Sequence, residues 1–123
     1  MRSTGAHLVF SSDLPGSDWS LFYGLHSAMT RQNKLGAPDG GWFPDQRMSA
    51  EEAVRGYSAW AAFASFDERS AGSVQVGKRA DFTVISADPF RLTRPDDLLK
   101  ATVRLTMVGG RVRAGSAAPP RSP

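Results

Sequence analysis

Few residues of this chain are of types that can do catalysis or bind a metal, and Asp13 is the most informative of them. It follows an apolar run at residues 6–12 and stands in a turn-forming stretch with Pro15 and Gly16. A carboxylate in such a place can ligate a divalent ion or carry a proton between water and a leaving group. Aspartate is also common in turns, so a purely structural role for Asp13 is the alternative.

Histidine and cysteine usage restricts the chemistry further. The chain has no cysteine, which excludes disulfides, cysteine-ligated zinc, iron–sulfur clusters and a cysteine nucleophile. Its 2 histidines, His7 and His26, are not spaced as a His-x-His pair. His7 lies early in the apolar run and His26 lies among hydrophobic residues of a predicted helix, so we expect structural roles for both. A catalytic zinc ion needs about three protein ligands and a water, and Asp13 alone cannot hold one.

Aromatic residues follow the turn that contains Asp13. These side chains could line a substrate pocket: Trp19, which is the candidate substrate contact, Phe22 and Tyr23. The alternative is that these aromatic side chains belong to the hydrophobic core. Asp18 is expected to cap the following helix rather than to ligate a metal.

The composition is that of an ordinary soluble domain. The chain has 123 residues, of which 41% are hydrophobic and 22% charged, and this length suffices for one domain. The net charge is +3, but lysine and arginine are scattered rather than grouped in a block. We therefore expect no nucleic-acid partner. There is no apolar run long enough for a membrane span and no signal-peptide pattern, so a cytoplasmic location without a membrane partner is expected.

The elements that must position Asp13 follow from hydrophobic periodicity. Residues 6–12 are rich in strand-forming types and predict a buried strand. Residues 19–32 predict a helix, with Asp18 or Ser20 as its N-cap. Residues 33–48 contain several glycines and prolines and predict a loop.

The strongest helix signal covers residues 50–64. Ser49 and Glu52 match a capping box, in which each side chain accepts a hydrogen bond from the other residue's backbone amide. Alanines recur along one face behind this cap, which predicts close approach to a neighbouring element.

After Gly72 the pattern changes from helical to strand-like. Strands are predicted at residues 73–76, 81–86 and 103–108. Residues 95–100 predict one or two helical turns, and Gly109-Gly110 predicts a tight hairpin into residues 111–113.

Several segments, taken in order, resemble the C-terminal portion of a metal-dependent amidohydrolase of the amidohydrolase-3 type, the group that includes N-substituted formamide deformylases. Residues 9–15 (VFSSDLP) are similar to the end of the last barrel strand, and residues 28–31 (AMTR) to the helix after it. Residues 44–53 (PDQRMSAEEA) and 72–85 (GSVQVGKRADFTVI) are similar to later family motifs, and the hairpin at residues 108–112 follows as expected.

This resemblance implies an α/β fold in which residues 1–70 are the last strand and helices of a (β/α)₈ barrel. Residues 71–114 would be the C-terminal part of a small antiparallel β-sandwich, and residues 115–123 a disordered tail. It also implies that Asp13 is both a ligand of a catalytic divalent metal, zinc by expectation, and the proton shuttle for hydrolysis of amide or formamide carbon–nitrogen bonds.

The family's His-x-His pair and further ligands are absent from the sequence. We therefore expect a fragment that alone binds no metal and is inactive, with an amide as small-molecule substrate of the complete enzyme. Its expected partner is the missing N-terminal barrel segment, or a second copy of itself.

The alternative is a stand-alone, non-enzymatic α/β binding protein that associates through exposed strand edges. A self-sufficient domain would unfold cooperatively. An orphaned barrel end would instead expose apolar surface and bind a hydrophobic dye.

Overall fold

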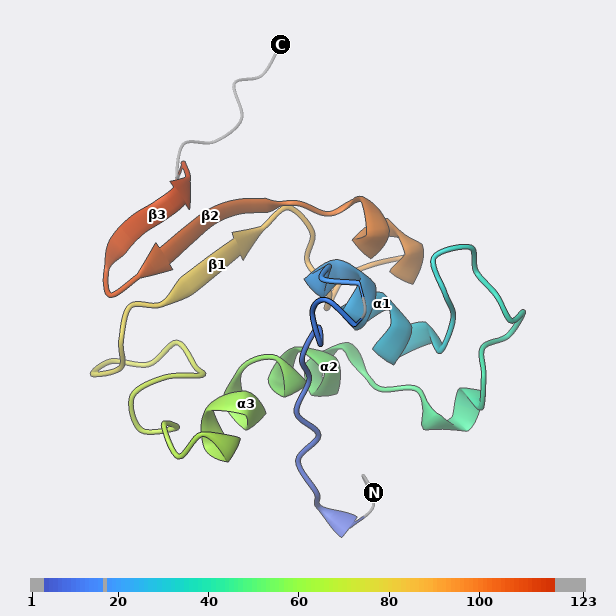
Figure 1. Ribbon diagram of the computed structural model, residues 1–123, viewed down its shortest axis with the longest axis horizontal. Helices are drawn as coiled ribbons and strands as arrows, with labels where there is room; N and C mark the ends of the chain where they lie inside the picture. Colours follow the sequence, from blue (N-terminus) through green and yellow to red (C-terminus); the bar gives the residue numbers. More distant parts are fainter. Residues whose placement is uncertain (1–3, 17, 117–123) are drawn as a thin grey trace.

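The computed structural model describes residues 4–16 and 18–116, which form an α/β arrangement with the helices beside a small sheet (Figure 1). The helices are α1 (Leu21–Thr30), η2 (Pro44–Gln46), α2 (Ala50–Gly56), α3 (Ala59–Ala64) and η3 (Pro95–Lys100), where η marks a 3₁₀ helix. The strands are β1 (Phe82–Ile85), β2 (Val103–Val108) and β3 (Arg111–Gly115). None of the helices in the described part of the chain is long and apolar enough to cross a membrane.

Helix α1 confirms the helix predicted over residues 19–32, with ends slightly inside that range. Its N-cap is Ser20, whose hydroxyl accepts a hydrogen bond from the amide of Tyr23 at 3.3 Å. The expectation that Asp18 caps this helix is wrong. The Asp18 carboxylate instead accepts from the amide of Ser20 at 2.8 Å and pairs with Lys34, so it fixes the residue that does the capping.

Residues 6–12 do not form the predicted strand. The segment is not in any sheet, and its one described backbone bond to another element runs from the amide of Phe10 to the carbonyl of Gly56 at 3.1 Å. A strand is defined by a ladder to a neighbour, and the described part of the chain places no second strand beside this segment. The prediction failed because the strand propensity of these residues does not supply a neighbouring strand with which they could pair.

The capping box at the start of α2 is confirmed. The Ser49 hydroxyl accepts from the Glu52 amide at 3.2 Å, and the Glu52 carboxylate accepts from the Ser49 amide at 2.8 Å. The prediction of one continuous helix over residues 50–64 is wrong, since α2 and α3 are separate. At the break, the Ser58 hydroxyl donates to the carbonyl of Val54 at 2.7 Å, a back-bond that often bends helices, and the Ser58 backbone leaves the helical region.

The sheet is antiparallel with strand order β1-β2-β3. Gly109 and Gly110 both have positive φ, 57° and 75°, which fits the predicted tight hairpin between β2 and β3. The strand predicted at residues 73–76 is wrong: this segment is irregular, and Val74 and Val76 are exposed. Strand β3 runs to Gly115, and residues 117–123 of the predicted tail lie outside the described residues.

The core lies where α1, α2 and η3 meet. The residues most buried there are Leu25, Met48, Ala53 and Leu98. Ala53 and Leu98 have no exposed surface, and the amide of Met48 donates to the carbonyl of Ala28 at 2.9 Å. Of the predicted alanine-rich face, Ala53 is buried, whereas Ala61 is half-buried and Ala64 is exposed. The predicted close approach is therefore confirmed at Ala53 and not along the whole face.

Gly56, at the end of α2, gives a test of this packing. A Cβ added there would lie 2.5 Å from Cδ2 of Phe10 and 2.9 Å from the carbonyl oxygen of Leu8. Overpacking of this kind costs about 1–3 kcal/mol, whereas replacing a helical glycine by alanine gains about 1 kcal/mol. We expect Gly56→Ala to lower the urea midpoint of unfolding and Phe10→Ala to remove much of that penalty; a midpoint that rises in Gly56→Ala would contradict the packing.

Candidate active site

Asp13 lies in a tight turn at the end of the extended segment 6–12. Its φ is 50°, a left-handed conformation that aspartate tolerates better than most residues. The Asp13 amide donates to the Ser11 hydroxyl at 3.3 Å, and the Asp13 carbonyl accepts from the Gly16 amide at 2.6 Å. A Cβ added to Gly16 would meet Oδ2 of Asp13 at 3.1 Å, so the carboxylate lies over this glycine. The turn therefore holds an exposed carboxylate just before α1.

The described residues do not by themselves fit a catalytic metal. Across residues 4–16 and 18–116, no group of three or more histidine, aspartate or glutamate side chains could hold a metal ion. A catalytic zinc site takes about three protein ligands, and Asp13 supplies a single carboxylate. The divalent metal that the family resemblance implies thus has no complete ligand set among the described residues.

The three aromatic residues after the turn differ in exposure, and Tyr23 is half-buried. The Trp19 side chain is 74% exposed, whereas Phe22 is buried on α1. Tyr23 carries Lys34 over its ring, with Nζ 5.0 Å from the ring centroid, and Lys34 also holds Asp18. The hydrogen bond from Lys34, followed by that from the Ser20 amide, lowers the pKa of the Asp18 carboxyl. Trp19 is the most exposed of these three aromatic residues. Its contact with substrate stays a prediction.

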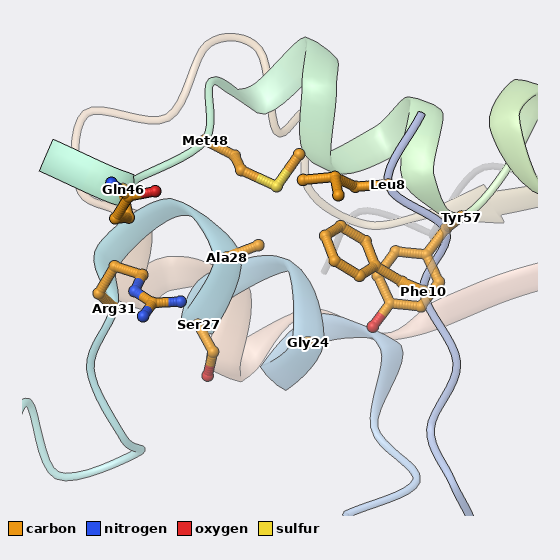
Figure 2. A pocket seen from close by; sticks show the side chains of 9 residues that line it. All are labelled: Leu8, Phe10, Gly24, Ser27, Ala28, Arg31, Gln46, Met48 and Tyr57. Carbon is orange, nitrogen blue, oxygen red and sulfur yellow. The ribbon is translucent and has the colours of Figure 1, made fainter. Parts of the chain in front are cut away.

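A groove that sequence reasoning missed lies between the extended segment, α1 and α2 (Figure 2). Its volume is about 510 Å³, within the usual range of small ligand pockets. Leu8, Phe10 and Tyr57 lie toward one end and Arg31 and Gln46 toward the other (Figure 2). The alternation of Leu8 and Phe10 on the predicted strand was the available sequence signal, because it places both side chains on one face.

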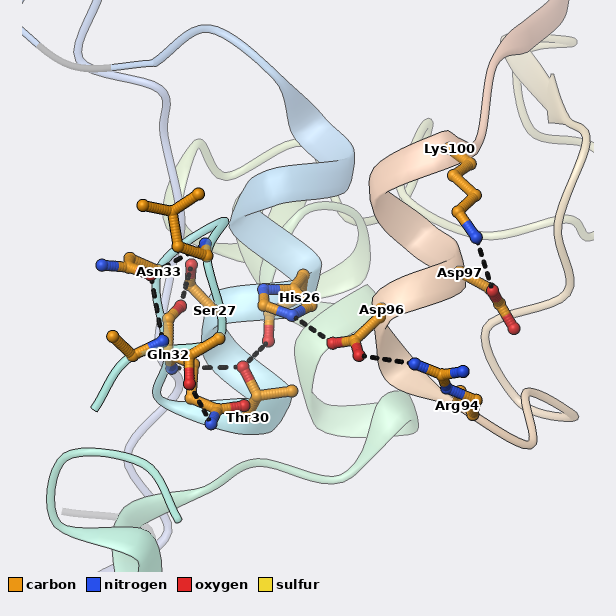
Figure 3. Close-up of polar contacts among 12 residues, drawn as sticks. His26, Ser27, Thr30, Gln32, Asn33, Arg94, Asp96, Asp97 and Lys100 are labelled. Atoms are coloured by element: carbon orange, nitrogen blue, oxygen red, sulfur yellow. Dashed lines mark hydrogen bonds and ion pairs between the residues drawn. The ribbon is translucent and has the colours of Figure 1, made fainter. Parts of the chain in front are cut away.

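His26 has the structural role that the sequence predicted, through a partner that the sequence did not reveal. The ring is fully buried on α1, and Nε2 lies 3.1 Å from Oδ1 of Asp96 on η3 (Figure 3). An ionised carboxylate only accepts hydrogen bonds, so Nε2 is the donor. Arg94 approaches the second oxygen of Asp96 at 3.4 Å, and the Thr30 hydroxyl donates to the His26 carbonyl at 2.8 Å. This cluster joins α1 to η3.

The other predicted residues do not join a common site. His7 stacks on Trp60, with ring centroids 5.3 Å apart, and meets the edge of Phe63 at 4.9 Å. This arrangement agrees with a packing role for His7. The described structure does not bring His7 or His26 to Asp13, which stands by itself in an exposed turn.

The link between His26 and Asp96 predicts a pH dependence. The hydrogen bond from His26, more than that from Arg94, lowers the pKa of the Asp96 carboxyl. A lowered folded-state pKa stabilises the fold above the unfolded value of about 3.9, and this stabilisation is lost as the pH falls through the folded-state pKa. We expect carbon-13 NMR to place the Asp96 midpoint below 3.9.

Arg94→Gln is the matched variant for this titration. It should raise the Asp96 midpoint only part of the way to the ordinary value, because the hydrogen bond from His26 remains. An Asp96 midpoint at or above about 3.9 in the unmodified chain would contradict the described pairing.

Comparison with known proteins finds similarity over most of the chain. The Amidohydrolase family model matches residues 1–114. N-substituted formamide deformylase of Arthrobacter pascens is 34% identical over 89 residues, which cover 72% of this chain and 16% of that protein. Protein LONG AFTER FAR-RED 3 of Arabidopsis thaliana is 33% identical over 99 residues, which cover 78% of this chain and 17% of that protein.

Putative amidohydrolase YtcJ of Bacillus subtilis strain 168 is 27% identical over 110 residues, which cover 89% of this chain and 21% of that protein. The chain thus spans between 16% and 21% of the length of these three curated relatives. No solved structure matches the chain. Because the family match extends over nearly the whole sequence, including Asp13 and the capped helix α2, this chain belongs to the amidohydrolase family.

Proposed function

We propose that this chain acts as the C-terminal part of a hydrolase that cleaves carbon–nitrogen bonds other than peptide bonds, and that Asp13 is the group it contributes to the reaction. The observation that carries the proposal is the family match over residues 1–114, with Asp13 in a turn between an extended segment and a helix. Barrel enzymes place their catalytic groups at this kind of junction, the C-terminal end of a strand.

In this proposal, residues 6–12 are the last strand of a (β/α)₈ barrel and α1 is the helix that follows it. The segment is extended and pairs with no strand of the described structure, as expected of a barrel strand separated from its neighbours. The antiparallel sheet β1-β2-β3 would then belong to the small β-sandwich beside the barrel. The partner is the polypeptide that supplies the other strands, and the location is the cytoplasm.

Asp13 would serve as the proton carrier. The carboxylate accepts a proton from water while the water oxygen bonds to the amide carbon, and it delivers that proton to the nitrogen as the carbon–nitrogen bond breaks. The products are a carboxylic acid and an amine. The name of the Arthrobacter pascens relative favours an N-substituted formamide as substrate, which would yield formate. A metal, zinc by the same resemblance, would need ligands from outside this chain.

The first test is the coding sequence upstream of Met1. An open frame that encodes an apolar strand followed by His-x-His supports the proposal. A stop codon directly before Met1 contradicts it and favours the alternative, a non-enzymatic binding protein that uses exposed strand edges.

Substitution of Asp13 in the protein expressed from the complete open frame tests the chemistry. General acid–base catalysis contributes about 10²–10⁴-fold, so we expect Asp13→Asn to lower kcat/KM for an N-substituted formamide by that factor. Formate release is the measurement. Asp39→Asn, in an exposed loop, is the matched control and should leave the rate unchanged.

Two results would contradict the assignment of Asp13. One is an Asp13→Asn protein that is folded and retains the full rate. The other is formate release by the isolated 123-residue chain at the rate of the complete protein, because the proposal requires groups that this chain does not contain.

A further inference from the structure

The groove beside the extended segment contains a positive charge that nothing in the described structure neutralises. Arg31 lines the groove together with apolar side chains (Figure 2) and is half-buried. Within residues 4–16 and 18–116, no carboxylate pairs with it, and its described side-chain hydrogen bond is made by Nε alone. The terminal nitrogens of the guanidinium are therefore available to an acceptor from outside.

Arg31 is held rigidly in this position. It ends α1 in a left-handed conformation with φ 62°, and its Nε donates to the carbonyl of Trp42 at 3.0 Å. The amide of Trp42 donates back to the Arg31 carbonyl at 2.9 Å. The guanidinium carbon lies 4.9 Å from the centroid of the Trp42 ring. Because these contacts fix the side chain, little conformational entropy is lost when a partner binds its free nitrogens.

The chemistry of the groove defines its occupant. A guanidinium offers a planar fork that matches a carboxylate with two parallel hydrogen bonds. The opposite end of the groove is apolar, with Leu8, Phe10 and Tyr57. A partial burial of charge is unfavourable unless the charge is paired. The groove thus fits an apolar group that presents one carboxylate at the Arg31 end.

We propose that this groove receives an apolar segment of the polypeptide that completes the barrel, and that an aspartate or glutamate on this segment pairs with Arg31. The groove is bordered by Leu8 and Phe10 of the extended segment, and the segment belongs to no sheet of the described structure, so a further segment can lie beside it. The chain also spans only 16% to 21% of its curated relatives. The inference rests on the proposed function for the existence of that polypeptide.

Hexanoate is a minimal probe of the groove, since it joins an apolar chain to one carboxylate. In NMR titrations of the 123-residue chain, we expect hexanoate to shift the Arg31 Nε–H and Met48 methyl signals. Hexanamide, its neutral counterpart, should bind at least about tenfold more weakly, because a hydrogen bond to a charged group contributes more than a neutral one. Equal binding of the two probes, or shifts confined to surface lysines, would overturn the proposal.

Variants separate charge from packing in this titration. Arg31→Gln should abolish the preference for hexanoate, and Arg31→Lys should restore part of it because the positive charge returns. Arg113→Gln removes an equal charge from exposed strand β3 and should leave the preference intact. The dispersion of amide signals shows whether each variant is folded, and a preference retained in folded Arg31→Gln would contradict the role of Arg31.

The same titration on the protein from the complete open frame tests the occupant. There we expect hexanoate to leave the Arg31 signal unchanged, because the segment already fills the groove. If hexanoate binds equally in both forms, the groove is a small-molecule site and the proposed occupant is wrong. This readout does not depend on hydrolysis, so an inactive complete protein would overturn the proposed function while leaving this result interpretable.

Discussion

The contact of α1 with α2 and η3 is the constraint on which the other features of this chain depend. Ala53 is small enough to let α2 approach α1, and Leu98 brings η3 against the same core. The hydrogen bond between His26 and Asp96 adds a directional link across a separation of 70 residues. Without this core, α1 would have no fixed position, and neither would the Asp13 turn ahead of it or the groove beside it.

Helix α1 lies in the sequence between the two chemically important positions. Its 10 residues span about 15 Å, with the Asp13 turn ahead of its first residue and Arg31 immediately after its last. Asp13 is exposed, and Arg31 lines an apolar groove. Neither side chain has an ion-pair partner among the described residues, so each is able to act on a group from outside this chain.

Local patterns were sufficient wherever an element depends on its own residues. The capping box at Ser49 and the Gly109-Gly110 hairpin satisfy backbone groups within a few residues, so the sequence predicted both. The strand expected at residues 6–12 depends on a neighbouring strand that pairs with it. The break at Ser58 depends on whether the Val54 carbonyl accepts from the Ser58 hydroxyl or from the Ser58 backbone amide. The same reasoning accounts for the candidate site: the turn at Asp13 is local and was predicted, whereas the Asp96 partner of His26 and the groove arise from packing between distant segments.

The sheet is attached to the helices in part through the ion pairs of Arg79. Arg79 connects the end of α3 to the start of β1 by pairing with both Asp67 and Asp81. The hydrogen bond from Arg79 lowers the pKa of the Asp67 carboxyl, and the hydrogen bond from the Gly109 amide, followed by that from Arg79, lowers the pKa of the Asp81 carboxyl. Beside it, an open groove of about 740 Å³ lies between the helices and β1. An exposed ion pair stabilises a fold only weakly, and the walls of an open groove make fewer dispersion contacts than a packed interface. These contacts between sheet and helices are therefore weak, which agrees with the proposal that a further polypeptide packs against them.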